Sequence, residues 1–176
     1  WLRALPREPA DASPARVQAL VLARIAAVDP LHRIAEKKIE VELVEERPWE
    51  RRMEYLRLNP AGKVPLFRTD DLVLGESTAI FEYLEEVQPD PPLLPKRPAE
   101  RAEARRLVAW FDDKFHHEVT ANLLYERVNK KLMKAGYPES DRIKAGLRNI
   151  KYHLDYIGWL IDQRRWLAGD QMTIAD

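Results

Sequence analysis

The sequence predicts two structural units, a small α/β domain followed by an all-α domain, and three patterns support this. Residues 39–46 read IEVELVEE, in which apolar and acidic residues alternate as they do in a half-buried strand. Residues 89–98 read PDPPLLPKRP, a proline-rich stretch that is typical of a stiff linker. Beyond this linker the pattern is helical to about residue 165.

Within the α/β domain, the strand is followed by a helix and a hairpin. A short helix is expected near residues 50–58 and ends before Pro60, because the residue before a proline avoids helical geometry. Two strands are expected near residues 64–68 and 72–75, joined by a tight turn at Thr69.

A second helix of this domain is expected to follow the hairpin, with Ser77 as its cap. Its apolar face consists of four residues at helical spacing: Ile80, Phe81, Leu84 and Val87. We place the domain limits at residues 34–88 for the α/β domain, 89–98 for the linker and 99–176 for the all-α domain.

The all-α domain is expected to begin with one long or broken helix that ends at a turn around Gly136 and Pro138. A second helix is expected to run from Ser140 to about Arg165. Six apolar residues of the first helix are expected to be mainly core: Trp110, Phe111, Phe115, Leu123, Leu124 and Tyr125.

Composition excludes several classes of function. Lys and Arg number 29, and so do Asp and Glu, so no net charge favours nucleic acid or an anionic membrane, and neither is expected as a partner. The chain has no cysteine, which excludes disulfides and thiolate chemistry and suits a reducing cytoplasm. His116 and His117 are adjacent and point to different faces of a helix, so no metal site is expected.

Three features of the α/β domain carry candidate binding chemistry. A cis Val64–Pro65 bond would turn the Val64 backbone outward to pair with an extended peptide, although trans is the commoner form. Ser77 at a helix N-terminus is suited to a carboxylate, and Glu76 to an ammonium group, although both also fit a plain N-cap. Lys63 is either a second carboxylate contact or a surface lysine. Together they predict a ligand with an amino acid end and another carboxylate.

In combination, four segments resemble the glutathione S-transferase superfamily over about residues 31–176: NPAGKVPLF, LVLGESTAIFEYLEE, PPLLP and WLAGDQMTIAD. The resemblance implies a thioredoxin-like N-terminal domain and an all-α C-terminal domain. It implies that Val64–Pro65 is the family's cis-proline, which meets the cysteinyl part of glutathione, that Glu76 and Ser77 hold the γ-glutamyl end, and that Lys63 contacts the glycyl carboxylate. Glutathione is thus the expected ligand or co-substrate, and a homodimer is the family's usual state.

Four further segments are similar to one subgroup, the bacterial cell-division proteins of this fold that bind the tubulin-like filament protein FtsZ: VEERPWERR, RRLVAWFDDKF, NLLYERVNKKLM and YHLDYIGWLIDQRRWLAGD. This similarity implies a protein-binding module, with Trp49 as an exposed partner contact. The alternative for Trp49 is packing against its own helix. The alternative functions are a transferase that conjugates glutathione to electrophiles and a regulator of this fold with a different protein partner.

Residues 1–33 depart from the family pattern. The family places a Tyr, Ser or Cys just after the first strand, where it stabilises the glutathione thiolate. The segment has no Tyr or Cys, and its one Ser, Ser13, follows no convincing strand, so no catalytic residue is assigned. We hypothesise that the segment is not the family's first strand and helix but a frameshifted reading of GC-rich DNA. Translation of the other two frames tests this hypothesis.

The last residues, GDQMTIAD, carry a helix-start signal. Thr173 and Asp176 are expected to form a capping box, in which the Thr173 hydroxyl accepts from the Asp176 N–H and the Asp176 carboxylate accepts from the Thr173 N–H. Met172 is expected to act as the hydrophobic staple. In the family such a box begins the buried central helix of the C-terminal domain, so the chain is expected to be truncated there and these residues to be structural.

Overall fold

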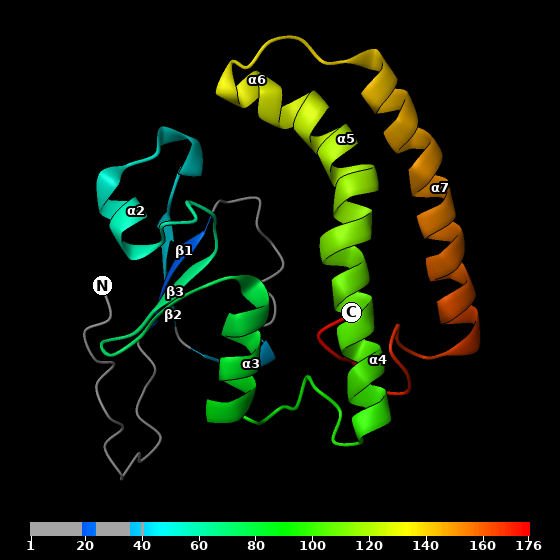
Figure 1. Cartoon of the computed structure of the whole chain (residues 1–176). Helices are drawn as coiled ribbons and strands as arrows, with labels where there is room; N and C mark the ends of the chain where they lie inside the picture. The colour runs from blue at the N-terminus through cyan, green and yellow to red at the C-terminus, as the bar shows by residue number, and fades with distance from the viewer. Residues whose placement is uncertain (1–18, 24–35, 40) are drawn as a thin grey trace. The chain divides into compact units, whose positions relative to one another are not determined.

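The structure, a computed structural model, describes residues 19–23, 36–39 and 41–176, with only the backbone of residues 19–23 (Figure 1). The chain divides into two compact units, residues 1–91 and 92–176. The division falls inside the proline-rich stretch 89–98. None of the described helices is long and apolar enough to cross a membrane.

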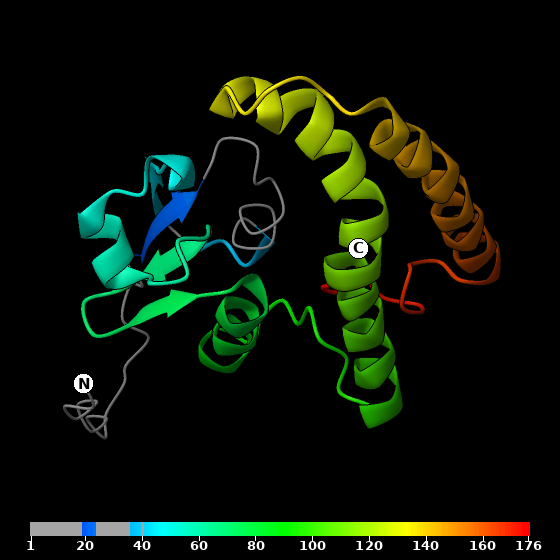
Figure 2. The same cartoon turned by 45° about the horizontal axis from the view of Figure 1, so that its top comes forward.

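The first unit is built on a four-stranded sheet with the order β2-β1-β3-β4. Its strands are β1 (Ala19–Ala23), β2 (Val41–Glu45), β3 (Leu66–Arg68) and β4 (Val73–Gly75). Strands β1 and β2 are parallel, whereas β3 is antiparallel to both β1 and β4 (Figures 1 and 2). This is the thioredoxin-like α/β unit that was predicted.

Strand β1 corrects one expectation from the sequence. The family's first strand was not expected within residues 1–33, where the run LVLARIAAV fitted either a short helix or a buried strand, yet Ala19 pairs with Val41 of β2 and Leu22 pairs with Leu66 of β3. A short apolar run fits a buried strand and a buried helix equally well, so periodicity could not identify it, and only pairing on both sides does. Ser13 and the rest of that segment lie outside the described residues, so the reading-frame hypothesis stays a prediction.

The helices of this unit follow the predicted order. A single 3₁₀ turn, η1 (Pro48–Glu50), precedes α2 (Met53–Leu58), which ends at Asn59 as predicted. Helix α3 (Ser77–Val87) packs Ile80 and Leu84 against Phe67 of β3, whereas Val87 is exposed. The hairpin between β3 and β4 is closed by the Thr69 N–H, which donates to the Leu72 carbonyl at 2.8 Å.

Lys37 anchors the end of α3, a role that the sequence did not suggest. Its side chain is buried, and its Nζ lies 2.6 Å from the Glu85 carboxylate. It also donates to the carbonyls of Gln88 at 2.7 Å and Pro91 at 3.0 Å. The last carbonyls of a helix lack helical partners, and a buried ammonium group needs several acceptors, so each satisfies the other.

The second unit consists of a long helical rod and a returning helix (Figure 1). The rod is continuous through α4 (Pro98–Ala109), η2 (Trp110–Thr120), α5 (Ala121–Leu124), η3 (Tyr125–Asn129) and α6 (Lys130–Met133), of which η2 and η3 are π-helical. It ends at Lys134 in a left-handed conformation. Helix α7 (Ser140–Gln163) then begins at Ser140, as predicted, and packs along the rod.

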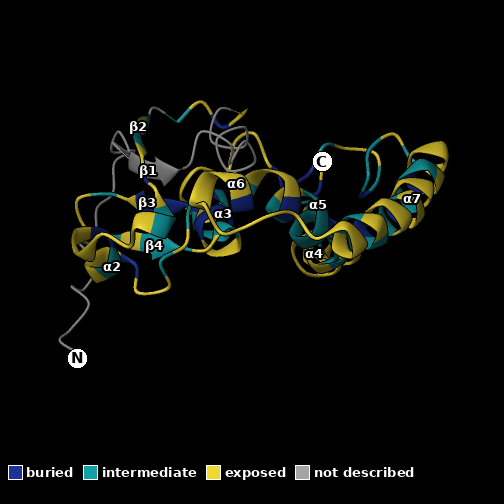
Figure 3. Ribbon diagram, turned by 90° about the horizontal axis from the view of Figure 1, so that it is seen from above, coloured by how far each residue is buried: buried dark blue, intermediate teal, exposed yellow. Residues whose placement is uncertain are grey.

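Helix α7 packs against the rod through three buried residues that are spaced seven positions apart. Gly146, His153 and Leu160 are its buried residues, and Figure 3 shows exposed residues along much of the rest of its length. A Cβ at Gly146 would lie 2.7 Å from the Leu123 side chain, so only glycine allows this close approach. This contact places Leu123 at the helix interface, in keeping with the core role expected for it.

A polar chain crosses the same interface. The Trp110 indole N–H donates to His153 Nδ1 at 3.1 Å, and His153 Nε2 lies 3.0 Å from the Glu118 carboxylate. Since Nδ1 accepts, Nε2 carries the hydrogen and donates to Glu118. The His153 ring also meets Trp110 and Phe115 edge-on. Trp110 and Phe115, two of the residues expected in the core, therefore contact a buried histidine, whereas Leu124, also expected there, is 46% exposed, which corrects that expectation.

The core of the second unit gathers residues from both ends of its sequence. Its buried members are Leu93, Leu94, Ala104, Leu107, Val108, Leu160, Ala168, Ile174 and Ala175. The Ile174 N–H donates to the Leu93 carbonyl at 2.9 Å, so the end of the chain is joined to the segment that precedes α4.

Glu103 of α4 joins the rod to the segment after α7. Its carboxylate accepts from Arg106 at 2.7 and 2.9 Å and from Arg164 at 2.7 Å. These bonds, chiefly the two from Arg106, outweigh partial burial and lower the pKa of Glu103 to about 2.

We expect this lowered pKa to make stability depend on pH. A carboxyl whose pKa is lowered by folding stabilises the folded state above its unfolded pKa, and that contribution is lost as the pH falls from about 4.5 toward about 2. At pH near 6, Glu103→Gln should lower the free energy of unfolding by about 1–2 kcal/mol. Near pH 2 most of this difference should be lost.

Urea unfolding, followed by circular dichroism at both pH values, measures this difference. Glu100→Gln is the matched control, because Glu100 lies on the same helix but pairs with an exposed Arg97. An equal loss for Glu103→Gln at both pH values would contradict the assignment.

Candidate functional site

The hairpin brings two predicted segments to one end of the sheet. Leu66, the first residue of β3, pairs with Gly75, the last residue of β4. In antiparallel strands the start of one lies beside the end of the other. Val64–Pro65 and Glu76–Ser77 are therefore neighbours in space, and Lys63 directly precedes them.

The Val64–Pro65 bond is cis. The spacing alone favoured trans, whereas the family resemblance implied cis. Pro65 is buried, and the half-buried Val64 packs with Val44 against Tyr55 and Leu66. The segment is thus held between the sheet and α2.

Two side chains fix the peptide that precedes Val64. The Tyr55 hydroxyl and Asn59 Nδ2 both donate to the Lys63 carbonyl, the latter at 2.7 Å. The C=O and N–H of a trans peptide point in opposite directions, so the Val64 N–H is directed away from Tyr55 and Asn59. This is the orientation that pairing with an extended ligand requires.

Asn59 also connects this loop to the end of β4. Its Oδ1 accepts from the Ala61 N–H at 3.2 Å, and its side chain is almost fully buried. A Cβ at Gly75 would lie 3.3 Å from Asn59 Nδ2, so the strand end packs directly on this amide. Burial raises the pKa of Tyr55, which keeps its hydroxyl a donor.

Tyr55 and Asn59 are site residues that the sequence analysis missed. The available signal was their spacing of four residues, which places both on one face at the end of α2. Their role could not be inferred because their acceptor, the Lys63 carbonyl, is a backbone atom of the following loop.

Glu76, and not Ser77, occupies the N-cap position of α3, which corrects the expected cap. Glu76 is exposed, has a φ of 67° and makes no side-chain cap hydrogen bond. Ser77 is the first helical residue. The first N–H groups of α3 and the Ser77 hydroxyl lie together at a helix N-terminus, whose partial positive charge favours an anion.

Lys63 places a positive charge at the start of this region. Its side chain is exposed, and no carboxylate of the described residues forms an ion pair with it. The end of the sheet therefore presents a cation, an oriented backbone N–H, a helix N-terminus and the Glu76 carboxylate. This arrangement is complementary to a peptide-like ligand with a zwitterionic end and a further carboxylate.

Trp49 lies in η1, within a loop that an ion pair between the buried Glu46 and the exposed Arg52 closes. Glu46 is 1% exposed, and its carboxylate accepts two hydrogen bonds from the Arg52 guanidinium, one of them at 3.2 Å. The hydrogen bonds that Arg52 donates to the Glu46 carboxylate raise the pKa of Arg52. Trp49 itself is half-buried. It is therefore neither fully exposed, as the flanking charges indicated, nor fully packed in the core.

Thr173 and Asp176 lie in the helical unit and form a cap that differs in detail from the expected box. The Asp176 carboxylate accepts from the Thr173 N–H at 2.8 Å. The Thr173 hydroxyl accepts from the Ala175 N–H at 3.1 Å, whereas the Asp176 N–H donates to the Thr173 carbonyl at 3.2 Å. Met172 packs half-buried against the core.

Metal and catalytic groups are the remaining candidates. In the described part of the chain, no three His, Asp or Glu residues lie close enough together to hold a metal. The family's thiolate-stabilising residue would follow β1, where the structure describes nothing until residue 36. The sequence contains no Ser, Thr, Tyr or Cys between Ser13 and Tyr55, and Ser13 precedes β1.

Comparison with known proteins extends these observations. Residues 32–87 match the model of the glutathione S-transferase N-terminal domain. The structure is similar to a glutathione S-transferase from Rhodospirillum rubrum F11, with 45% identity, a TM-score of 0.86 and coverage of 90% of this chain and 73% of that one. It is also similar to FzlA from C. crescentus, with 39% identity, a TM-score of 0.84 and coverage of 90% and 74%.

A curated relative, the FtsZ-localized protein A of Caulobacter vibrioides strain NA1000, is 42% identical over 147 residues. The match includes 81% of this chain and 64% of that protein, so the chain spans less than two thirds of the relative's length.

We expect Asn59 to be the main support of the loop before Pro65. Asn59→Ala should lower the free energy of unfolding by about 2 kcal/mol, and Tyr55→Phe by about 1 kcal/mol, because Asn59 makes more of the contacts. Hydrogen exchange at the Ala61 amide should accelerate in Asn59→Ala. Asn149→Ala, in the other unit, is the control and should leave this amide unchanged. Unaltered exchange at Ala61 in Asn59→Ala would show that the loop does not depend on Asn59.

Proposed function

Because the chain belongs to the glutathione S-transferase superfamily, we propose that it acts as a protein-binding module of the FtsZ-binding type, with a glutathione-type site and little or no transferase activity. The observation that carries this proposal is the 42% identity to a protein named for its localisation with FtsZ, over 81% of the chain. The aligned region covers residues of the helical unit as well as the glutathione motifs.

Trp49 is the proposed contact with the FtsZ filament. Tryptophan is enriched among residues that dominate the energy of protein interfaces. The ion pair of the buried Glu46 with Arg52 closes the loop that carries Trp49, so less conformational entropy is lost on binding. The half-buried ring keeps part of its surface available to a partner.

Glutathione is the proposed ligand of the end of the sheet. Its γ-glutamyl carboxylate would accept from the N-terminus of α3 and the Ser77 hydroxyl, and its ammonium group would pair with Glu76. Its cysteinyl segment would pair with the Val64 backbone. Its glycyl carboxylate would meet Lys63.

The residues present favour binding over group transfer. A transferase stabilises the glutathione thiolate with a hydroxyl or thiol, and residues 14–54 contain no Ser, Thr, Tyr or Cys. The alternative is a glutathione S-transferase that acts on electrophiles, which the 45% identity to the Rhodospirillum enzyme favours. Turnover of an electrophilic substrate with glutathione would distinguish the transferase from the binding module.

A cytoplasmic homodimer completes the proposal, since the family usually dimerises. Neither nucleic acid nor membrane is proposed as a partner, because Lys and Arg balance Asp and Glu at 29 each.

We expect Trp49→Ala to abolish co-sedimentation with FtsZ filaments. Loss of an interface tryptophan costs about 2 kcal/mol or more, which lowers affinity more than tenfold. Trp159→Ala is the matched control, because Trp159 is an exposed tryptophan of α7 in the other unit. Thermal unfolding checks that each variant folds. A folded full-length protein that fails to co-sediment with FtsZ would refute the proposal.

We expect glutathione to bind and Ser77→Ala to weaken its binding by about tenfold, because a hydrogen bond to a charged group is lost. Thr78→Ala, at the next and exposed position, should leave the affinity unchanged. Isothermal titration calorimetry measures both. Conjugation of an electrophile by the wild type, well above the uncatalysed rate, would favour the transferase instead.

A further inference from the structure

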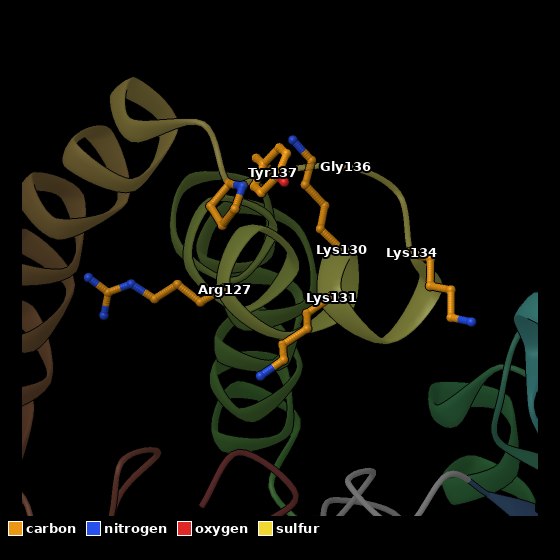
Figure 4. A pocket seen from close by; sticks show the side chains of 7 residues that line it. Arg127, Lys130, Lys131, Lys134, Gly136 and Tyr137 are labelled. Atoms are coloured by element: carbon orange, nitrogen blue, oxygen red, sulfur yellow. The ribbon is translucent and has the colours of Figure 1, made fainter.

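The helical unit contains a basic pocket where the rod turns toward α7. A cavity of about 450 Å³ is lined by six residues with side chains, which we call the basic corner: Arg127, Lys130, Lys131, Lys134, Tyr137 and Pro138 (Figure 4). None of them belongs to the glutathione-type site or to the Trp49 loop.

One cation of the basic corner is used by the fold. Lys130 Nζ lies 2.8 Å from the buried Glu126 carboxylate and 2.7 Å from that of Glu139. Glu126 also accepts from the Glu139 N–H at 2.8 Å and lies 3.5 Å from Arg142. This network ties the end of the rod to the start of α7, so the pocket is held in shape before any ligand arrives.

The other three cations of the basic corner are not neutralised. No carboxylate of the described residues forms an ion pair with Arg127, Lys131 or Lys134. In Figure 4 their charged groups extend in different directions from the helix and do not converge on one point. A single small anion would contact at most part of this set, whereas a chain with several spaced carboxylates matches it.

Exposed apolar side chains accompany these cations. Leu124, Val128 and Leu132 are 46%, 41% and 53% exposed and recur every fourth residue along the same part of the rod. Tyr137, in the pocket itself, is 94% exposed. Aromatic residues and arginine are enriched at surfaces that bind polypeptides, and lysines beside them add electrostatic complementarity to an acidic partner.

We propose that the basic corner, with the neighbouring apolar residues, binds an acidic polypeptide segment that carries apolar side chains between its carboxylates. The carboxylates pair with the other three cations of the basic corner, and the apolar side chains cover Tyr137 and the exposed Leu124, Val128 and Leu132. Nucleic acid is the less suitable occupant, since its phosphates leave the apolar residues uncovered. This inference does not depend on the proposed contact at Trp49, because it uses a different surface in the other unit.

Fluorescence anisotropy of a labelled synthetic peptide with alternating Asp and Leu tests this site in the full-length protein. We expect the wild type to bind, with an affinity that falls as salt rises. The double charge reversal Lys131→Glu with Lys134→Glu should weaken binding at least about tenfold. The milder pair Lys131→Gln with Lys134→Gln should weaken it less, and circular dichroism confirms that each variant folds.

The matched control reverses two exposed cations of α7, Arg148→Glu with Lys151→Glu, and should leave binding unchanged. The proposal is overturned if the wild type does not bind the peptide, or if the control pair loses as much affinity as the corner pair. It is also overturned if a neutral Asn–Leu peptide binds equally well, or if a single-stranded oligonucleotide binds more tightly than the acidic peptide. The assay uses a synthetic peptide and no FtsZ. Its outcomes are therefore distinct from the outcome of the co-sedimentation assay with FtsZ.

Discussion

The geometry of the candidate glutathione site depends on the hydrogen bonds that Tyr55 and Asn59 donate to the Lys63 carbonyl. These bonds orient the peptide before Val64, and Asn59 also packs against Gly75 at the end of β4. One buried amide thus aligns both halves of the site, of which one precedes β3 and the other follows β4. An unpaired buried carbonyl would cost free energy, so the loop has one favourable orientation.

Buried or half-buried charges hold the chain where it changes direction in each unit. Lys37 satisfies the end of α3, Glu46 pairs with Arg52 across the Trp49 loop, and Glu126 with Lys130 closes the corner before α7. An isolated buried charge is unstable, so each of these groups requires its partner in place. The highly charged composition therefore serves to define geometry as well as to solvate the surface.

Each of the three proposed binding regions has a support of its own. The glutathione-type site rests on Asn59, the Trp49 loop on the pair of Glu46 and Arg52, and the basic corner on the network around Lys130. A fold does not by itself specify a function. Because the three supports share no residue, a substitution in one region leaves the supports of the other two intact. A glutathione-type ligand site and protein-binding surfaces can therefore be proposed for the same chain.

The order of the helices and of the hairpin, and the division into two units, follow from the sequence alone, because periodicity, prolines and turn residues act locally. The sequence did not determine that Ala19–Ala23 is a strand, that Glu76 replaces Ser77 at the cap, or that Tyr55 and Asn59 support Lys63. Those features depend on pairing between residues far apart in the chain or on backbone atoms of another segment. Only the tertiary structure decides them, because their free energy arises from partners that no local pattern identifies.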